Sequence, residues 1–353
     1  MLLSRLRLVS LGPFADLTIP LCDEDGVPKP IVVLFGTEGI GKTTILSAIA
    51  TTRPGHTIAQ HQPWKTDASA DGPPFVVTEW QLGDDDPNRP HPLRVASPNA
   101  RLDERDDEAL LRRREQTLFD RRAGERGFVL VPISGARWFS RTAVMLTSPE
   151  RTLLRYDVRS TVNFEDATRT DLARETKQIL SYACIAAALS REGSGGPRLE
   201  LPRLERALRG TLTELLEADG YAFLGVDPVR LEPVFRDPEE RRVEFDDLPR
   251  SLRHVVAFGA LVVRALAAAC LDRDPRESEG VVLLDDLESE QPLFRQRTLV
   301  NRLHRALPRV QWIITTSSPD VALGCPPSSL IALRRRPGGA AIDLHEGVDA
   351  VLH

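Results

Sequence analysis

The chain has 353 residues, of which 41% are hydrophobic and 27% are charged, and its formal net charge at pH 7 is −5. This composition is that of an ordinary globular protein with room for one large or two modest domains. The acidic balance excludes a uniformly basic nucleic-acid binder, although a local arginine face is compatible with it. The four cysteines are far apart and form no C-x-x-C pair, so neither a zinc site nor a disulfide framework is indicated.

No apolar run was found that is long enough to span a bilayer, and no signal peptide follows Met1. The first residues instead interleave arginines with leucines, as a strand does. We therefore expect a cytoplasmic protein with no membrane partner.

The first predicted element is an edge hairpin over residues 3–21, with Gly12 and Pro13 at its turn. A polar, proline-containing loop at 23–30 leads to five apolar residues at 31–35, which predict a buried strand. The sequence G-T-E-G-I-G-K-T follows at 36–43, and the apolar pattern up to residue 50 predicts a helix.

This strand, glycine loop and helix together predict a site for a nucleoside triphosphate. The backbone N–H groups of the loop turn inward around the phosphates, and the dipole of the following helix adds to that field. Lys42 is expected to reach the β- and γ-phosphates, and the Thr43 hydroxyl to bind Mg²⁺. Glycine is expected wherever a Cβ would obstruct the turn or the phosphate. The predicted nucleotide-binding residues are Gly36, Thr37, Glu38, Gly39, Ile40, Gly41, Lys42, Thr43 and Thr44.

Residues 51–74 predict an irregular polar connection, and a second hairpin follows with strands at 75–82 and 91–95. The stretch 101–126 is dense in both charges. It predicts either a solvated helix with many ion pairs or a nucleic-acid contact through its arginines. Those arginines are Arg112, Arg113, Arg114, Arg121 and Arg122.

A buried strand is predicted at 127–133, and the loop 134–141 after it carries Arg137 and Arg141. Arginines on such a loop could contact a phosphate or form surface ion pairs, and the sequence does not decide between the two. Residues 165–218 are predicted to be mostly helical, broken at 193–197, and short strands are predicted over 221–244.

The last third begins with a strongly apolar helix at 248–270 and then places four apolar residues before Asp285 and Asp286. A fully buried parallel strand would deliver Asp285 to its carboxyl end, where a carboxylate can hold Mg²⁺ through water. An amphipathic helix at 291–307 and a strand at 309–316 complete a right-handed βαβ crossover. That last strand ends in hydroxyl side chains, so Ser317 is predicted to lie near the phosphates.

The order of these elements resembles the ABC-type ATPases of the SMC and RecF class, which includes predicted ATP-binding proteins of bacterial repair and defence loci. The resemblance covers nearly the whole chain, and the opening 6–14 is similar to the first strand of that class. It implies an α/β fold: a P-loop NTPase with an ABC-type head and an inserted, mainly helical lid. The implied divisions are 1–100 with the phosphate loop and hairpins, 101–244 as the lid, and 245–353 with the signature helix, the acidic strand and the final strands.

In that class two subunits sandwich two ATP molecules, and the signature segment of one reaches the γ-phosphate held by the other. By position the signature here is 247–253, with Ser251 in the place of the usual glycine and proline in the place of the usual serine. Ser251 and the helix N-terminus could contact a phosphate. An ordinary serine N-cap explains the same residue equally well.

Two further departures from the class predict slow hydrolysis. The residue after the metal-site acid is usually a water-polarising glutamate, whereas here it is Asp286, one methylene shorter. Glu288 is close in sequence, but two positions further along the strand direction its side chain can point elsewhere. Ser317 replaces the histidine that commonly follows the last strand. The absence of this histidine is more similar to RecF than to transporters or SMC proteins.

The leading hypothesis is an ATPase switch that binds ATP and Mg²⁺, dimerises through its nucleotide face as a homodimer or heterodimer, and acts on DNA or on an effector protein. Lys42 and Asp286 are its predicted catalytic residues, and Thr43 and Asp285 its metal ligands. The settings it suggests are DNA repair and anti-phage defence. A non-hydrolysing scaffold stabilised by ATP is the alternative, and a small-molecule kinase is a weaker third, because the two acids lie so late in the chain.

Overall fold

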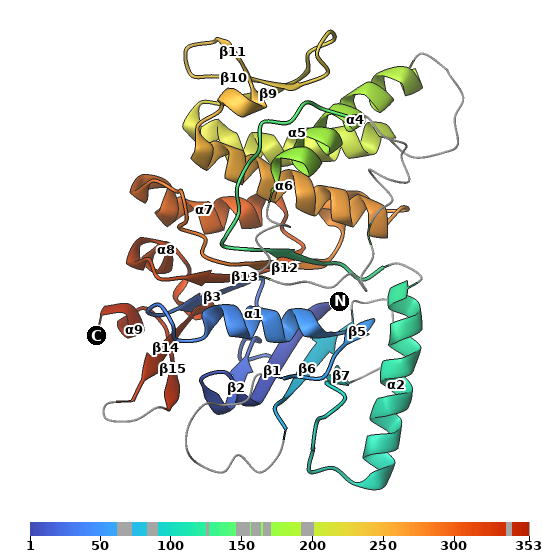
Figure 1. Cartoon of the computed structure of the whole chain (residues 1–353), viewed down its shortest axis with the longest axis vertical. Coiled ribbons are helices and arrows are strands. Elements are labelled where there is room, and N and C mark those ends of the chain that lie inside the picture. Colours follow the sequence, from blue (N-terminus) through green and yellow to red (C-terminus); the bar gives the residue numbers. More distant parts are fainter. Residues whose placement is uncertain are drawn as a thin grey trace.

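The centre of the computed structural model is a six-stranded sheet in the order β15–β14–β3–β13–β12–β8 (Figure 1). Five of these strands are parallel, and the edge strand β15 is antiparallel to β14. The structure describes residues 1–61, 73–82, 91–124, 127–145, 156, 164, 171–191, 201–336 and 341–352. The strands are β3 (Ile31–Phe35), β8 (Leu130–Ile133), β12 (Gly280–Leu284), β13 (Val310–Thr316), β14 (Leu330–Arg335) and β15 (Ile342–Glu346).

The central strands are buried on both faces, as their continuous apolar runs predict. Successive side chains point to opposite sides, so Val32 and Leu34 of β3 enter one core while Ile31 and Val33 enter the other. The same alternation occurs on β12 and β13. The sheet therefore separates two hydrophobic cores, and its carboxyl edge is where a ligand can meet loops from both sides.

One core lies between the central sheet, the helix α1 (Lys42–Thr51) and a four-stranded antiparallel sheet in the order β2–β1–β6–β7 (Figure 1). The two hairpins predicted from the sequence are confirmed, and pairing of β1 with β6 joins them into this one sheet. Its strands are β1 (Leu2–Leu11), β2 (Phe14–Pro20), β6 (Phe75–Gln81) and β7 (Leu93–Ala96).

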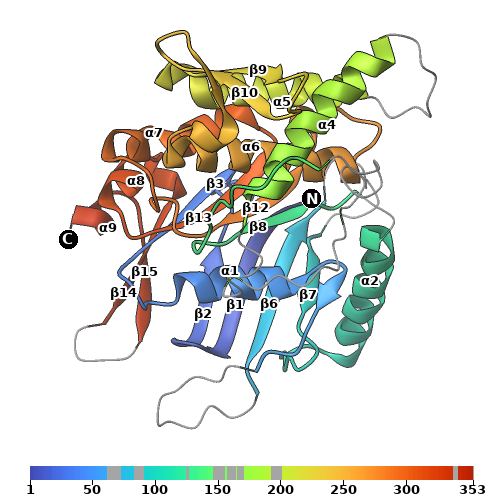
Figure 2. The ribbon, with the colours of Figure 1, turned by 45° about the horizontal axis from the view of Figure 1, so that its top comes forward.

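The connection predicted to be irregular after α1 contains a short hairpin, β4 (Thr52–Arg53) with β5 (His56–Thr57). The charged helix α2 (Asp106–Gly124) stands beside β7, as Figure 2 shows. Arg112 pairs with Glu104 and Arg105 with Glu108, so the predicted ion pairs are present. Arg113, Arg114 and Arg121 are exposed, and Arg122 lies outside the residues whose side chains are described.

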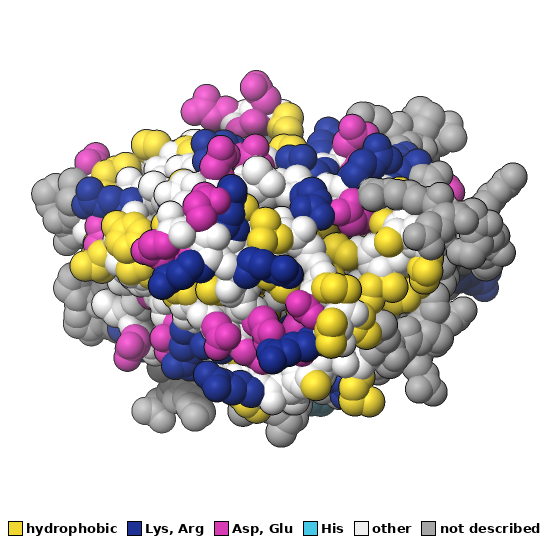
Figure 3. All heavy atoms as spheres, turned by 90° about the horizontal axis from the view of Figure 1, so that it is seen from above, with side chains coloured by type: hydrophobic (Ala, Val, Ile, Leu, Met, Phe, Trp, Pro, Cys, Tyr) yellow, Lys and Arg dark blue, Asp and Glu magenta, His cyan; other side chains and the backbone are white. Residues whose placement is uncertain are grey.

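The other core is covered by helices α4 (Ala173–Arg191), α5 (Leu201–Leu216), α6 (Arg250–Ala269) and α7 (Leu293–Ala306), with a three-stranded sheet β11–β10–β9 above them (Figures 1 and 2). On this upper face acidic and basic side chains are interspersed (Figure 3). The remaining elements are β9 (Ala222–Val226), β10 (Pro233–Arg236), β11 (Arg242–Glu244), α8 (Pro319–Leu323), α9 (Asp349–Leu352) and the 3₁₀ turns Glu217–Asp219, Phe245–Asp247, Pro275–Glu277 and Pro327–Ser329.

Helix α6 corrects the expectation that no segment is apolar enough to cross a membrane. Among the described residues it is the one helix long and apolar enough to do so by length and composition. Most of its side chains are buried inside the fold, including Phe258 and Leu266 with no exposed surface. This is the environment of a core helix.

The segment 101–244, predicted to be an inserted and mainly helical lid, contains the helices α2, α4 and α5. Its strand β8 pairs in parallel with β12 at the edge of the central sheet. Its helices α4 and α5 share one core with α6 and the central strands, and it also contributes the three strands β9, β10 and β11. The apolar faces of α4 and α5 must be covered, and helix α6, together with α7 and β9, provides that cover.

Candidate functional site

The phosphate loop, residues 36–43, connects β3 to α1 at the carboxyl edge of the central sheet. Gly39 and Gly41 have φ values of +69° and +98°, a region that residues with a Cβ rarely adopt. The Gly36 N–H donates to the Thr316 carbonyl at 3.2 Å, which ties the start of the loop to β13. The Ile40 side chain is buried in the core beneath the loop, so of this predicted residue only the backbone can serve a ligand.

Gly41 is required for a reason the sequence did not indicate. A Cβ at this position would lie 2.5 Å from Pro13 Cγ and 2.8 Å from Phe14 Cζ. The turn of the first hairpin thus packs directly on the phosphate loop, and Pro13 lines the cavity beside it. The hairpin fixes the shape of the loop as well as covering the core.

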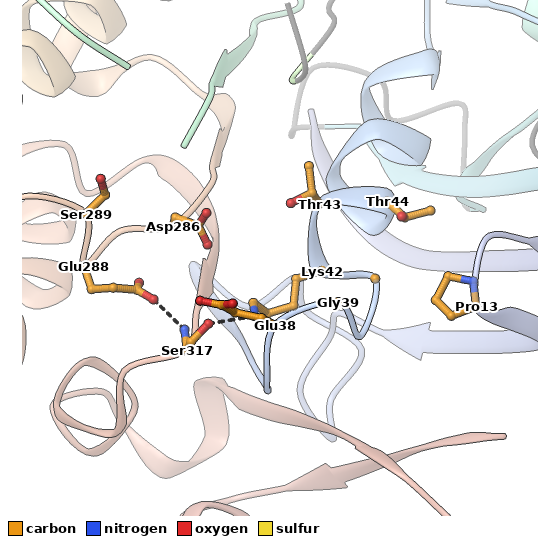
Figure 4. Close-up of a pocket in the computed structure, with 11 residues that line it drawn as sticks. Pro13, Glu38, Gly39, Lys42, Thr43, Thr44, Asp286, Glu288, Ser289 and Ser317 are labelled. Carbon is orange, nitrogen blue, oxygen red and sulfur yellow. Dashed lines mark hydrogen bonds between the residues drawn. The ribbon is translucent and has the colours of Figure 1, made fainter. Parts of the chain in front are cut away.

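The Lys42 amine lies at the centre of the loop. It donates to the carbonyls of Gly36 at 2.7 Å and Thr37 at 3.1 Å, and to Ser317 Oγ at 2.9 Å (Figure 4). Burial lowers the pKa of Lys42, while the surrounding carboxylates, Asp286 foremost, act in the opposite direction. Ser317, which was predicted to lie near the phosphates, is thus brought to the lysine of the phosphate loop.

Thr43 links the phosphate loop to the far end of the chain. Its hydroxyl donates to both carboxylate oxygens of Asp285, at 3.0 and 3.1 Å. Asp285 also accepts a hydrogen bond from the buried Thr315 hydroxyl at 2.6 Å. The two groups predicted to bind Mg²⁺ therefore meet, although 242 positions separate them in the sequence.

We call residues 285–290, which follow β12, the acidic turn. Asp286 has a φ of +46° there, and its N–H donates to Thr315 Oγ1 at 2.8 Å. Its carboxylate faces the cavity opposite Thr43 and Lys42 (Figure 4). Burial, the neighbouring Asp285 and then Glu288 raise the pKa of Asp286, which makes it a better proton acceptor when ionised.

Glu288 also lines the cavity, contrary to the expectation that it could point elsewhere. Both its carboxylate oxygens are engaged by the end of β13: Oε1 accepts from the Ser317 N–H at 2.6 Å and Oε2 from the Thr316 hydroxyl at 2.7 Å. The sequence signal was its place in an acidic segment after a buried strand. Glu288 holds the strand end that carries Ser317.

Arg137 is neither a phosphate contact nor a surface residue, so both alternatives for it were wrong. Its side chain is 4% exposed and lies behind the acidic turn, where it donates to backbone carbonyls. Burial lowers its pKa to about 10, which leaves the guanidinium charged at neutral pH. Arg141 is exposed.

Ser251 lies in the first turn of α6, whose N-cap is Pro249, so the alternative of a serine N-cap is wrong. The Ser251 carbonyl accepts a hydrogen bond from the Gln291 side chain at 3.1 Å. Ser251 does not line the cavity beside Lys42. Its contact with a nucleotide held by a second subunit stays a prediction.

The residues from both sides enclose a cavity of about 540 Å³, within the usual size of ligand sites. The described lining contains the predicted residues Glu38, Gly39, Gly41, Lys42, Thr43, Thr44, Asp286 and Ser317, with Pro13, Glu288 and Ser289 in addition. An amine, a threonine hydroxyl and carboxylates on opposite walls are the donor set that a magnesium-bound triphosphate requires. The residues present fit such a group.

Comparison with known proteins places the fold. No protein-family description and no curated protein matches the sequence. Two SMC structures are similar over nearly the whole chain at 12% identity and a TM-score of 0.50. One is the Pyrococcus furiosus Smc head with an extended coiled coil bound to the C-terminal domain of ScpA, covering 99% of this chain and 98% of that one; the other is an SmcHead bound to the C-winged helix domain of ScpA, covering 98% of each. The SMC head domain from Thermotoga maritima is 14% identical, with a TM-score of 0.46 and coverage of 98% and 99%.

The fold is therefore the ABC-type P-loop NTPase fold of SMC head domains, a mixed α/β architecture built on a parallel sheet. The fold class predicted from the sequence is confirmed. At this identity the likeness concerns the fold alone.

Proposed function

We propose that this protein is an ATPase of the ABC type that binds ATP with Mg²⁺ and hydrolyses it slowly. One observation carries the proposal: Lys42 and Thr43 of the phosphate loop and the acids of the turn face each other across one cavity, with Thr43 hydrogen-bonded to Asp285. A glycine turn with a chance lysine would not require such a meeting.

Each residue has a defined task in this proposal. The phosphate loop N–H groups and Lys42 would hold the phosphates, and Thr43 and Asp285 would hold the metal. Bound Mg²⁺ and ATP would supply charge neutralisation and the transferable phosphoryl group. Asp286 orients the attacking water and accepts its proton, a role to which its raised pKa is suited.

Slow hydrolysis is expected because neither candidate general base, Glu288 or Asp286, is well placed to orient the attacking water. Glu288 is bound through both oxygens to the end of β13, so it is not free to orient water. Asp286 reaches one methylene less far than a glutamate would, and a displacement of about 1 Å can cost about a hundredfold in rate. The Ser317 side chain provides a hydroxyl where the class usually has an imidazole.

We further propose that the face carrying the cavity pairs with a second copy or a related chain, with Ser251 reaching the partner's nucleotide. The SMC heads of similar fold were solved with ScpA domains bound, which supports a role for partner proteins. DNA or an effector protein would then receive the ATP-dependent change, in a repair or anti-phage defence setting within the cytoplasm. The exposed Arg113 and Arg114 on α2 are the candidate DNA contacts.

Phosphate release by the purified protein tests the proposal, in parallel with Lys42→Ala and Asp286→Asn. We expect a low rate that Lys42→Ala abolishes, and a larger particle in light scattering when Asp286→Asn is given ATP and Mg²⁺. Arg309→Ala, at an exposed ion pair with Glu279, is the matched control and should change neither result. A rate unaffected by Lys42→Ala would overturn hydrolysis at this site.

A non-hydrolysing scaffold is the second candidate, and the engagement of Glu288 by Ser317 and Thr316 favours it. In that case ATP would enlarge the wild-type particle without releasing phosphate. Loss of this enlargement in Lys42→Ala would support the scaffold, whereas a phosphorylated small-molecule acceptor would indicate a kinase.

A further inference from the structure

Arg137 occupies a position that none of the proposed ATPase roles uses. It comes from the loop after β8, yet it lies directly behind the acidic turn, about 150 residues later in the chain. Its Nη1 donates to the carbonyls of Asp285 at 2.7 Å and Ser134 at 3.1 Å. Its Nη2 donates to the carbonyl of Asp286 at 2.8 Å, with longer contacts to those of Leu287 and Ser289.

These contacts go to backbone oxygens and not to a carboxylate. Among the described residues no acid lies within ion-pair distance of the guanidinium, although the side chain is 4% exposed. By contrast, the equally buried Arg295 and Arg302 both pair with Asp219. A buried cation without a direct ion pair is costly, so its retention requires compensation from the carbonyls of the turn, helped by the charges of the nearby carboxylates, Asp286 foremost.

The turn that Arg137 binds needs such support. Asp286 and Glu290 have φ values of +46° and +62°, a conformation unfavourable for residues with a Cβ. Arg137 binds the carbonyls of the two peptide groups that flank the Asp286 Cα, which fixes the direction of the Asp286 side chain toward the cavity.

The guanidinium also contacts helix α6. Its Cζ lies 5.1 Å from the centre of the Phe258 ring, in a cation–π arrangement. Phe258 is fully buried on the helix whose first turn carries Ser251. One side chain thus connects the loop after β8, the acidic turn and the proposed signature helix.

We propose that Arg137 is a positioning residue for the hydrolytic step, which holds the Asp285–Asp286 backbone so that the Asp285 carboxylate stays on the Thr43 hydroxyl and the Asp286 carboxylate faces the cavity. This rests on the proposed ATPase function and assigns a residue to that same site. Arg137 does not line the cavity, so it acts through the turn and not on the nucleotide.

The test compares Arg137→Met and Arg137→Lys with Arg302→Met, which removes a similarly buried guanidinium that binds Asp219 and does not line the cavity. Thermal unfolding by circular dichroism, steady-state kcat and KM, and the affinity for a fluorescent ATP analogue with Mg²⁺ or with EDTA are measured for each. We expect Arg137→Met to lower kcat about tenfold to a hundredfold, since a displaced catalytic group costs about that much, with KM changed less than threefold. Arg137→Lys should recover part of kcat, because an ammonium keeps the charge but cannot bridge the carbonyls.

Arg302→Met should unfold at a lower temperature but keep kcat within about twofold. A folded Arg137→Met with kcat within twofold of wild type would overturn the proposal, as would equal losses of kcat in the Arg302 control. Should Arg137→Met not fold, Arg137→Lys decides by the same criteria.

The nucleotide-affinity measurement separates this proposal from the function on which it rests. If the wild type binds the analogue but releases no phosphate, the proposed hydrolytic function is wrong. The positioning role of Arg137 is then tested by the effect of Mg²⁺ on the affinity for the analogue. In that case the gain in analogue affinity on adding Mg²⁺ should be at least threefold smaller in Arg137→Met than in wild type, because the backbone of Asp285 is no longer held. An unchanged Mg²⁺ effect would exclude the positioning role.

Discussion

The two walls of the cavity are built in opposite ways. The phosphate loop is local: strand, loop and helix are consecutive, and Lys42 finds two of its three partners within the loop itself. The acidic turn is assembled from distant segments, because its residues depend on Thr315 of β13 and on Arg137 of the loop after β8. The first wall can be recognised in a sequence, whereas the second exists only once the whole sheet has formed.

The largest effect should come from the local wall. Replacing Lys42 with alanine removes a charged donor to the phosphates, and such hydrogen bonds contribute about 1.5–3 kcal/mol, which lowers ATP affinity about ten- to a hundredfold. Calorimetric titration with Mg²⁺ and ATP measures this. Lys29→Ala, a lysine of the preceding loop, should bind as wild type does. Equal affinity in Lys42→Ala would show that the loop does not hold the phosphates.

The substitution Gly135→Ala should disturb the acidic turn without affecting the phosphate loop. The new Cβ would lie 2.8 Å from Asp286 Oδ2. The carboxylate is the flexible partner, so it should move while the fold is kept, and kcat should fall about tenfold or more. ATP affinity should stay within twofold. Ala136→Ser adds one atom at the exposed neighbouring position and should leave kcat unchanged; a similar loss there would contradict the steric explanation.

A third experiment tests how much the acidic turn depends on the buried hydroxyl of Thr315. Thr315→Val removes the donor to Asp285 and the acceptor for the Asp286 N–H, so the free energy of unfolding should fall by about 1–3 kcal/mol. Urea unfolding measures the difference. Thr211→Val is the matched control, because the buried Thr211 hydroxyl has no hydrogen-bond partner among the described residues. Its unfolding free energy should be unchanged or higher.

The smallest expected effect is a pH dependence of the free energy of unfolding, caused by the buried His254 of α6. Burial, followed by the nearby guanidiniums of Arg137, Arg250 and Arg253, lowers the pKa of His254 on α6 to about 3. The unfolded chain binds a proton there below pH 6.5 and the folded chain does not, so stability falls as the pH drops from 6.5 toward 3. Between pH 7 and 5.5 this group alone should cost about 1 kcal/mol.

His254→Leu should remove that part of the pH dependence, as measured by urea unfolding at pH 7.0, 6.0 and 5.5. His345→Leu, at an exposed histidine of β15, serves as the control and should keep the wild-type slope. If wild type and His254→Leu lose stability in parallel, His254 is not kept neutral by the fold.

The contrast between the walls also explains what the sequence could predict. The strands β3 and β12 carry uninterrupted apolar runs and β13 carries one broken by Gln311. The residues at their carboxyl ends follow from the parallel order, so the meeting of Lys42, Thr43, Asp285 and Ser317 was predictable. The joining of the two hairpins into one sheet was not, because pairing of β1 with β6 leaves no pattern that differs from two separate hairpins.

Arg137 was missed for a related reason. Arginine is usually exposed, and an arginine in a polar loop gives no sign that its targets are backbone carbonyls of another segment. The boundaries proposed at 101 and 244 likewise gave no sign that the short strand β8 inside that range pairs with β12 at the edge of the central sheet. Local pattern predicts an element but not the partner on which it packs.

Helix α6 has a consequence for the synthesis of this chain. Its apolar surface packs against β12 and β13, which are translated after it, so for roughly fifty residues of elongation the nascent helix lacks those strands. During that interval an apolar stretch of 20 residues has α4, α5 and the short strand β8 to cover it. Expression at low temperature or together with a chaperone should therefore raise the yield of this protein more than changes to its surface would.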